Sequence, residues 1–244
     1  MTGGDTARDA TPIRSLEWME RGTDLLAGAL DRLADADLDG TTPLPGWSRR
    51  HLVAHLGFNA AALRRLASWA RTGEPNPMYA SPEQRAAEIA EGASWPAGRL
   101  RDLVSEHSAG LRADLAALDD RQWGAPVVTA QGRTVPASEI PWLRVREVAV
   151  HAVDLDAGVA FADLPVDLCE ELLSDVAARR SVKGEDPALS LVSATGRTWS
   201  VDGQGTPVRV GGEPGELARW LTGRGAGTLT DEHGAPPPAL TAWL

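Results

Sequence analysis

Apolar residues recur every three or four positions along the first two thirds of the chain, which is the spacing of amphipathic helices. The segments with this pattern are 13–38, 49–72, 82–91, 97–118 and 142–157. The third and fourth segments could also be one long helix broken at 92–96. Loops rich in glycine and proline separate the segments, and Ser48 and Ser81-Pro82 are typical helix starts. Residues 121–136 are predicted to be irregular, with a short extended stretch at 126–129. This part of the chain is therefore predicted to be a bundle of four or five helices.

The pattern changes after residue 158. Helices are predicted at 165–180 and 214–222, and segments 189–193 and 197–201 flank a short turn, as in a β-hairpin. A third strand is predicted at 206–210, and the tail after 235–238 is expected to form a final helix or strand. The fold class is therefore predicted to be α plus α+β. We expect a four-helix bundle in residues 1–160 and a small α+β domain in residues 161–244.

The net charge narrows the range of partners. The sequence has 24 Lys and Arg against 34 Asp and Glu, so its formal net charge is −10 at pH 7. Binding to nucleic acid or to an anionic membrane needs cationic side chains that neutralise phosphate, so neither partner is expected. An anionic substrate would need arginines placed locally in its site.

The ends and the single cysteine bear on the compartment. The first fourteen residues lack an apolar segment, and no run of about 18 apolar residues occurs, so neither a signal peptide nor a membrane span is expected. The first twelve residues are expected to be frayed, and a cytoplasmic monomer is the default expectation. Cys169 lies among leucines of a predicted helix, which favours a buried structural role over a nucleophilic one.

Two histidines and a glutamate are the strongest chemical signal. Glu147 lies four residues before His151, a spacing that puts both side chains on one helix face, about one turn apart. His55 lies in an apolar stretch of another helix. A buried charge needs compensation, which a metal ion can supply. Two histidines and one carboxylate with an open fourth position are typical of catalytic zinc, and other divalent ions accept the same ligands. Asp154 could accept the free ring N–H of a ligand histidine.

Less specific explanations stay open for this pattern. A Glu-x-x-x-His pair also occurs by chance and can serve only as a hydrogen-bonded pair that stabilises a helix. His51, His107 and His233 lie in polar surroundings typical of solvated side chains. The glycine-rich run 223–227 resembles a phosphate loop, but it follows a predicted helix rather than a strand, which argues against dinucleotide binding.

Several motifs together are similar to one family. They are Pro45-Gly46-Trp47-Ser48-Arg49 followed by His55-Leu56 and Asn59-Ala60, the stretch 144–155, and the stretch 84–89. They resemble the helix motifs of DinB-like metal-dependent bundles, and most of all those of the mycothiol-dependent maleylpyruvate isomerase family. The last part of the chain resembles the sterol-carrier-like domain of these isomerases, with 220–224 near its end. The resemblance covers about residues 14–225.

The resemblance implies a metal-dependent enzyme. The metal ligands would be His55, Glu147 and His151, and the ion would be Zn²⁺ or another divalent metal. The ion would in turn bind the sulfur of mycothiol and keep this thiol deprotonated. The thiolate would add to the cis double bond of maleylpyruvate, the new single bond would rotate, and elimination would give fumarylpyruvate, a step in gentisate breakdown. The nucleophile would thus come from the cofactor.

The small anionic substrate implies arginines in the site. By their positions in the matched segments, Arg85 and Arg224 are the candidates to clamp a carboxylate and stabilise developing charge. If Arg224 contributes, the second domain completes the site.

Three other functions remain open on the sequence. A mycothiol S-transferase would share the metal site and act on another electrophile without needing the two arginines. A non-catalytic module would bind a metal or ligand without turnover. A hydrolase would use metal-bound water, but no further general base is apparent in the sequence.

Overall fold

The computed structural model describes residues 12–243, so the fraying expected at the N-terminus falls largely outside the described residues. The chain forms two compact units, Met1–Val159 and Ala160–Leu244, a division one residue before the one expected from the sequence. No helix among residues 12–243 is long and apolar enough to cross a lipid bilayer.

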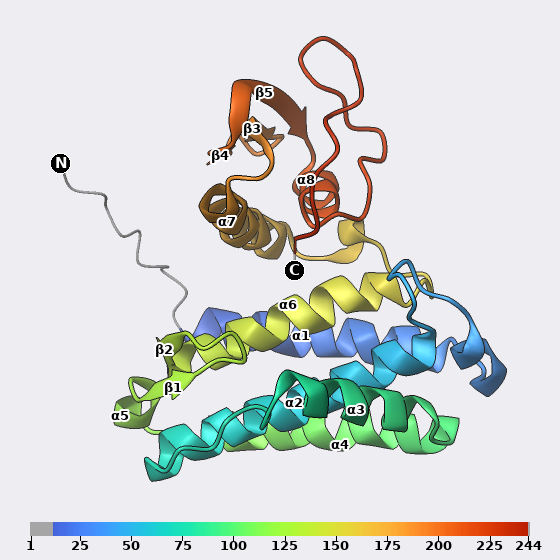
Figure 1. The fold of residues 1–244 in the computed structure, drawn as a ribbon, viewed down its shortest axis with the longest axis vertical. Coiled ribbons are helices and arrows are strands. Elements are labelled where there is room, and N and C mark those ends of the chain that lie inside the picture. Colours follow the sequence, from blue (N-terminus) through green and yellow to red (C-terminus); the bar gives the residue numbers. More distant parts are fainter. Residues whose placement is uncertain (1–11, 244) are drawn as a thin grey trace. The chain divides into compact units, whose positions relative to one another are not determined.

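The first unit is a helix bundle. Its helices are α1 Pro12–Asp31, α2 Arg49–Thr72, α3 Pro82–Ala93, α4 Ala97–Ala116, α5 Asp120–Trp123 and α6 Ile140–Asp154. The long helices α1, α2, α4 and α6 run side by side, with α1 packed on α6 and α2 packed on both α4 and α6 (Figure 1). Their facing sides bury a leucine-rich core that includes Leu26, Leu52, Leu56 and Leu100. The predicted fold class, α plus α+β with a four-helix bundle, is confirmed.

The bounds of α2 are those that the sequence predicts. Ser48 precedes the helix in an extended conformation, and its backbone N–H donates to His51 Nδ1 over 3.3 Å. Gly73 ends the helix with φ +77°, and its N–H donates to the Trp69 carbonyl over 2.8 Å. Glycine adopts this left-handed conformation without the strain that a side chain would add.

The first helix is shorter than predicted. It ends at Asp31, and the short 3-10 helix η1 Asp35–Asp39 follows. The Asp37 carboxylate accepts the Ala34 N–H over 2.8 Å, so the aspartates hold the backbone in a local turn while Leu38 stays buried. Segments 82–91 and 97–118 are separate helices, which is one of the two arrangements expected, whereas α5 was not predicted.

A small β-hairpin lies within the stretch predicted to be irregular. Strand β1 Pro126–Val128 pairs antiparallel with β2 Thr134–Pro136, and the 3-10 helix η2 Ala137–Glu139 leads from the hairpin into α6. The expected extended stretch at 126–129 corresponds to β1.

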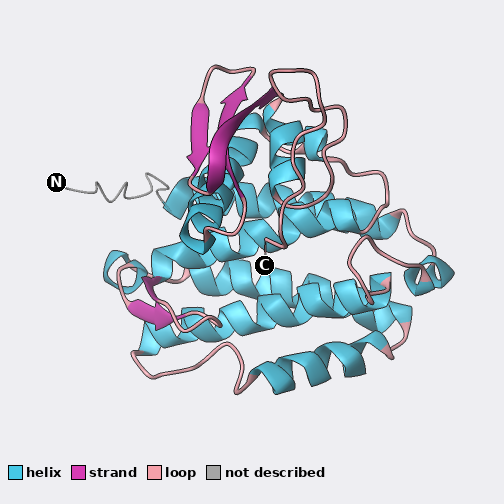
Figure 2. Cartoon of the chain, turned by 45° about the horizontal axis from the view of Figure 1, so that its top comes forward, coloured by secondary structure: helices cyan, strands magenta, loops and turns pink. Residues whose placement is uncertain are grey.

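The second unit is a small α+β fold. Its elements are the 3-10 helix η3 Phe161–Asp163, helix α7 Val166–Lys183, strands β3 Pro187–Ser193, β4 Thr198–Val201 and β5 Gln204–Gly212, and helix α8 Pro214–Leu221. The predicted hairpin is β3 and β4, and β5 pairs parallel with β3 on its other side (Figure 2). Between β4 and β5 the backbone passes close to the start of β3 at Gly203, where a Cβ would collide with the Asp186 carbonyl.

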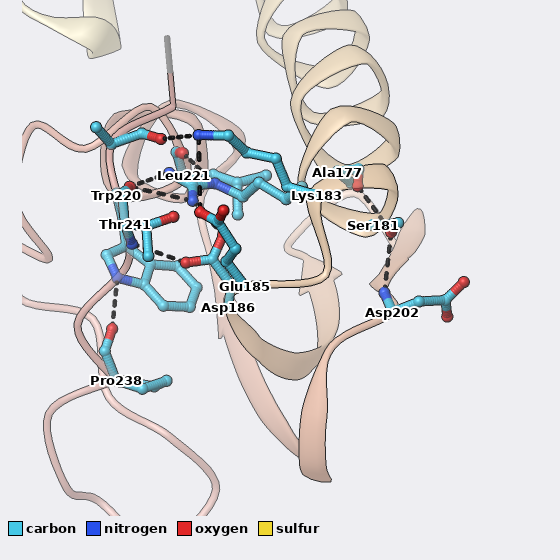
Figure 3. Close-up of polar contacts among 12 residues, drawn as sticks. Ala177, Ser181, Lys183, Glu185, Asp186, Asp202, Trp220, Leu221, Pro238 and Thr241 are labelled. Carbon is cyan, nitrogen blue, oxygen red and sulfur yellow. Dashed lines mark hydrogen bonds and ion pairs between the residues drawn. The ribbon is translucent and has the colours of Figure 1, made fainter.

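The end of the second unit forms neither helix nor strand up to residue 243, so the helix or strand expected there is wrong. Polar contacts hold this segment instead (Figure 3). The Thr241 N–H donates to Asp186 over 2.7 Å, and Asp186 also pairs with Arg180 at 2.5 Å. Trp220 donates from its ring N–H to the Pro238 carbonyl over 3.3 Å. These backbone and side-chain bonds replace the ladder that a strand would supply.

Candidate metal centre

His55 on α2 and Glu147 and His151 on α6 come together in the first unit. One nitrogen or oxygen atom from each of the three side chains lies within 4.8 Å of the other two. His55 Nε2 is 2.8 Å from Glu147 Oε2, and His151 Nε2 is 3.4 Å from the same oxygen. The two imidazole rings meet nearly at right angles, with centroids 5.3 Å apart. Both Nε2 atoms therefore lie close to one carboxylate oxygen, that of His55 across the α2–α6 contact and that of His151 within α6.

Helix geometry explains this convergence. The four-residue spacing on α6 stacks Glu147 and His151 on the side that packs against α2. His55 is 4% exposed, whereas the side chains of Glu147 and His151 keep 22% and 16% of their exposure. The cluster therefore lies between the two helices, and the side chains of Glu147 and His151 are partly accessible to solvent.

Asp154 orients the His151 ring. Its carboxylate is fully buried, and Oδ2 lies 2.8 Å from His151 Nδ1. A proton on Nδ1 would bond to this carboxylate and leave the lone pair of Nε2 directed at Glu147. This is the contact expected for Asp154 from its three-residue spacing after His151.

The three groups set each other's protonation. Burial by itself would raise the pKa of Glu147, but the charges and hydrogen bonds of His55 and His151 hold that pKa well below its ordinary value. Burial would lower the pKa of His151, and hydrogen bonds to Asp154 and Glu147 outweigh it and raise that pKa. Burial dominates at His55 and lowers its pKa, although Glu147 opposes the shift. The cluster at neutral pH thus holds an ionised carboxylate beside a neutral His55.

This donor set fits a divalent metal ion. Two imidazole nitrogens and one carboxylate oxygen are the ligands that catalytic zinc takes, with a further coordination position left for another ligand. Other first-row divalent ions accept the same donors. The buried Asp154 behind His151 is the kind of outer partner that ligand histidines carry in metal sites.

Arg85, one of the two candidate arginines, lies beside the cluster. Its Nη2 is 3.3 Å from His55 Nδ1, and its guanidinium lies 5.9 Å from the centre of the Tyr79 ring. Burial raises the pKa of Tyr79, although the charge of Arg85 acts to lower it, and the Trp47 ring meets the His55 ring edge-on with centroids 5.4 Å apart. Sequence reasoning assigned no role to Tyr79 or Trp47, although Trp47 belongs to the quoted motif before α2.

Arg224, the other candidate, belongs to the second unit and is therefore not among the residues that the first unit brings together. It lies in the turn after α8, where Nη1 donates to the Thr222 carbonyl over 2.6 Å. Gly223 and Gly225 on either side of it both have positive φ angles, +83° and +86°. The run 223–227 follows a helix, as the sequence predicts.

The remaining histidines and the cysteine have other surroundings. His51 Nδ1 lies 2.8 Å from Ser48 Oγ at the start of α2, and His107 Nδ1 lies 3.4 Å from Arg64. His233 is 81% exposed in the second unit. Cys169 is buried, and this burial together with nearby carboxylates raises the pKa of its thiol to about 12. A thiol with this pKa is a poor nucleophile at neutral pH.

Comparison with known proteins identifies relatives for both units. The model of a family described as the mycothiol maleylpyruvate isomerase N-terminal domain matches residues 19–156. A crystal structure of the mycothiol-dependent maleylpyruvate isomerase matches with a TM-score of 0.90 and 35% sequence identity, over 98% of this chain and 100% of that one. A histidine-to-alanine mutant of that isomerase matches with a TM-score of 0.89 and 34% identity over the same shares.

A more distant similarity concerns the bundle alone. YfiT from Bacillus subtilis, described as a probable metal-dependent hydrolase with an unusual four-helix bundle topology, matches with a TM-score of 0.51. Its sequence is 17% identical, and the match covers 64% of this chain and 91% of that one, so it shows a shared fold. A search of curated proteins finds no match. The family model spans more than half of this sequence and the isomerase structure spans nearly all of it, so the chain belongs to the mycothiol-dependent maleylpyruvate isomerase family.

Proposed function

We propose that this chain is a metal- and mycothiol-dependent isomerase that converts maleylpyruvate to fumarylpyruvate. The observation that carries the proposal is the meeting of His55, Glu147 and His151 at one point, within a chain similar over 98% of its length to a mycothiol-dependent maleylpyruvate isomerase. We take zinc as the ion, the cytoplasm as the compartment and gentisate breakdown as the pathway, on the family resemblance.

The side chains of His55, Glu147 and His151 would hold the ion. Glu147 is ionised and supplies the negative charge, and its oxygen faces both Nε2 atoms. Asp154 fixes the His151 ring so that Nε2 points to the ion. When bound, the ion would keep the mycothiol thiol deprotonated, and that thiol supplies the nucleophile that frees the substrate's double bond to rotate.

Arg85 is proposed to bind a substrate carboxylate. In the structure it donates toward His55 Nδ1. A neutral His55 that ligates through Nε2 carries its proton on Nδ1, and that proton faces the Arg85 donor. The guanidinium then lacks its acceptor and can donate to an incoming carboxylate beside the ion. Trp47 packs edge-on against the same His55 ring.

Arg224 is also proposed to bind the anionic substrate. The substrate and the charge that develops on it are anionic, and a chain of net charge −10 needs local cations to attract and stabilise them. Gly223 and Gly225, whose φ angles are positive, shape the turn that carries Arg224.

The test is a turnover assay on metal-loaded protein. We expect maleylpyruvate absorbance to decay only with mycothiol present, fumarylpyruvate to form, and all mycothiol to be recovered. Loss of one mycothiol per turnover into a stable adduct would identify the S-transferase instead, and no reaction would favour a non-catalytic module. Formation of fumarylpyruvate at the same rate without mycothiol would contradict the proposal.

Arg85→Ala separates the isomerase from the transferase with maleylpyruvate as substrate. Loss of a charge-assisted hydrogen bond should lower kcat/KM about 10- to 100-fold. Arg112→Ala is the matched control, because its side chain is 70% exposed on α4, and it should keep the wild-type rate. Equal rates for all three proteins would remove Arg85 from the site.

A further inference from the structure

Arg144 on α6 is a buried cation that forms no ion pair within residues 12–243. It is 1% exposed. Nη1 donates to the Leu56 carbonyl and to Asn59 Oδ1, each over 2.8 Å, and Nη2 donates to Ser108 Oγ over 3.1 Å. Nε has no acceptor among the described residues. Every acceptor is neutral, so nothing bonded to the guanidinium cancels its charge.

A second buried arginine shows the usual arrangement. Arg180 in the second unit is also 1% exposed, and it pairs with the Asp186 carboxylate at 2.5 Å. A charge withdrawn from water is costly unless an opposite charge compensates it. Burial lowers the pKa of Arg144 to about 10, so its guanidinium is still charged at neutral pH. The burial of Arg144 is therefore unfavourable in free energy, whereas the Asp186 carboxylate offsets this penalty for Arg180.

The position of Arg144 links it to the metal centre. It lies one helical turn before Glu147 on α6, and its acceptors on α2 are Leu56, next to His55, and Asn59, one turn beyond His55. Three charged or titratable groups interact with it electrostatically: Glu147 on α6, His107 on α4, and Tyr79 in the segment before α3. Glu147, a proposed metal ligand, is the carboxylate whose charge acts on it.

The charges around the proposed metal centre favour an anionic ligand. A divalent ion is cancelled by the carboxylates of Glu147 and Asp154 when both histidines are neutral. Arg144, together with Arg85 beside His55, then leaves the surroundings of the ion positively charged, and an anion on the ion would reduce that charge. A neutral ligand, by contrast, would leave the guanidinium uncompensated.

We propose that Arg144 determines ligand specificity at this centre: its buried, unpaired charge favours an anionic ligand, such as a thiolate, over a neutral one. The inference rests on the proposed metal centre and deepens it. Arg144 touches neither the ion nor the ligand in this scheme and acts through the local field. The same guanidinium ties α2 to α6, so the test must separate charge from structure.

The experiment measures ligand preference on cobalt-loaded protein, without substrate or turnover. The visible spectrum of bound Co²⁺ is titrated with azide, an anion, and with imidazole, a neutral ligand. In Arg144→Met, we expect the azide affinity to fall about tenfold or more relative to wild type, by loss of a nearby charge in a medium of low dielectric. The imidazole affinity should change less than about twofold, since no net charge enters with that ligand.

Two further variants keep the test decisive. Arg144→Lys retains the charge with fewer hydrogen bonds and should keep the preference for azide, and it serves if Arg144→Met does not fold. Ser108→Ala removes one hydrogen bond to Arg144 and leaves its charge, so its preference should equal that of wild type. Equal weakening of azide and imidazole in Arg144→Met, or an unchanged azide affinity, would overturn the inference.

The outcome is distinguishable from failure of the proposed function. If the wild-type protein prefers azide through Arg144 but does not isomerise maleylpyruvate, the inference about Arg144 stands and the proposed substrate is wrong. A wild-type protein that binds no cobalt would overturn the metal centre and the inference together.

Discussion

The Asp154 carboxylate holds His151 from a fully buried position and so supports a ligand of the proposed metal centre. Replacing it with Asn keeps the shape but weakens the bond to Nδ1. We expect Asp154→Asn to lower zinc affinity about 10- to 100-fold, measured by competition with a chelator. The matched control is Asp156→Asn, the same change two residues on at a side chain that is 83% exposed. Equal affinities in the two variants would show that Asp154 does not support a ligand.

The raised pKa of His151 predicts how zinc binding depends on pH. Its ordinary pKa is 6.5, and hydrogen bonds to Asp154 and Glu147 raise it in spite of burial. In the metal-free protein, the stability from this shift is therefore present below pH 6.5 and lost as the pH rises through the raised value. Zinc needs the neutral ring, so its affinity has the opposite dependence.

Zinc affinity should therefore increase with pH and level off only above pH 6.5. Chelator competition between about pH 5 and 9 measures the curve, since histidines titrate in that range. A curve that levels off below pH 6.5 would mean that His151 does not hold the competing proton.

Residue spacing was enough to find part of this centre. Glu147 and His151 follow from the helical period, because residues four apart share a face whatever surrounds them. That His55 faces them depends on how two helices pack, and the sequence pointed to it through its apolar surroundings and a family motif. Arg144 begins the quoted stretch 144–155 and was given no role, since no local pattern reveals that a buried arginine lacks a carboxylate.

At the scale of the elements, the close contact of α2 and α4 depends on Gly57. A Cβ at this position would lie 2.5 Å from Leu103 Cγ, a branched atom that cannot swing away freely. Gly57→Ala should lower the free energy of unfolding by about 1–3 kcal/mol through overpacking. Urea unfolding measures the change.

Gly28 on α1 provides the matched control, because a Cβ there would meet nothing closer than 4.0 Å. Gly28→Ala should raise the free energy of unfolding by about 0.5–1 kcal/mol, since alanine loses less backbone entropy in a helix. The two substitutions are chemically identical and are predicted to differ in sign. A stabilised Gly57→Ala would contradict the packing argument.

Elements with clear local signals were predicted well. Ser48 and Gly73 mark the ends of α2, and Ser81 accepts the Gln84 N–H at the start of α3, as its position before Pro82 suggests. The parallel pairing of β5 with β3 could not be predicted, because it depends on how the chain crosses at Gly203 and not on any local period. The early end of α1 also escaped prediction, since its apolar spacing continues to the buried Leu38.

At the scale of the whole molecule, hydrogen bonds to Asp186 hold the last segment of the second unit in place. Asp186 accepts from Arg180 and from the Thr241 backbone, and so joins α7 to the end of the chain. Burial would raise the pKa of Asp186, but these hydrogen bonds hold it below its ordinary value of 3.8. The stability from this shift is therefore present above pH 3.8 and lost as the pH falls through the lowered value.

Asp186→Asn should lower the free energy of unfolding by about 3–5 kcal/mol at neutral pH, because it leaves the Arg180 charge buried and unpaired. The deficit relative to wild type should shrink only below pH 3.8. Glu185→Gln, a neighbouring side chain that is 60% exposed, should stay within about 0.5 kcal/mol of wild type. Urea unfolding at neutral and acid pH makes the comparison, and a deficit independent of pH would contradict the role of the carboxylate.

The central claim is that the cluster of His55, Glu147 and His151 is a metal centre on which thiol-dependent isomerisation depends. The most direct test adds zinc back to metal-stripped protein and follows maleylpyruvate isomerisation with mycothiol present. We predict no activity before addition, a linear rise with bound zinc, and a plateau at one equivalent per chain, with His55→Ala inactive and unable to retain the ion. Full activity in the metal-stripped protein would contradict the account.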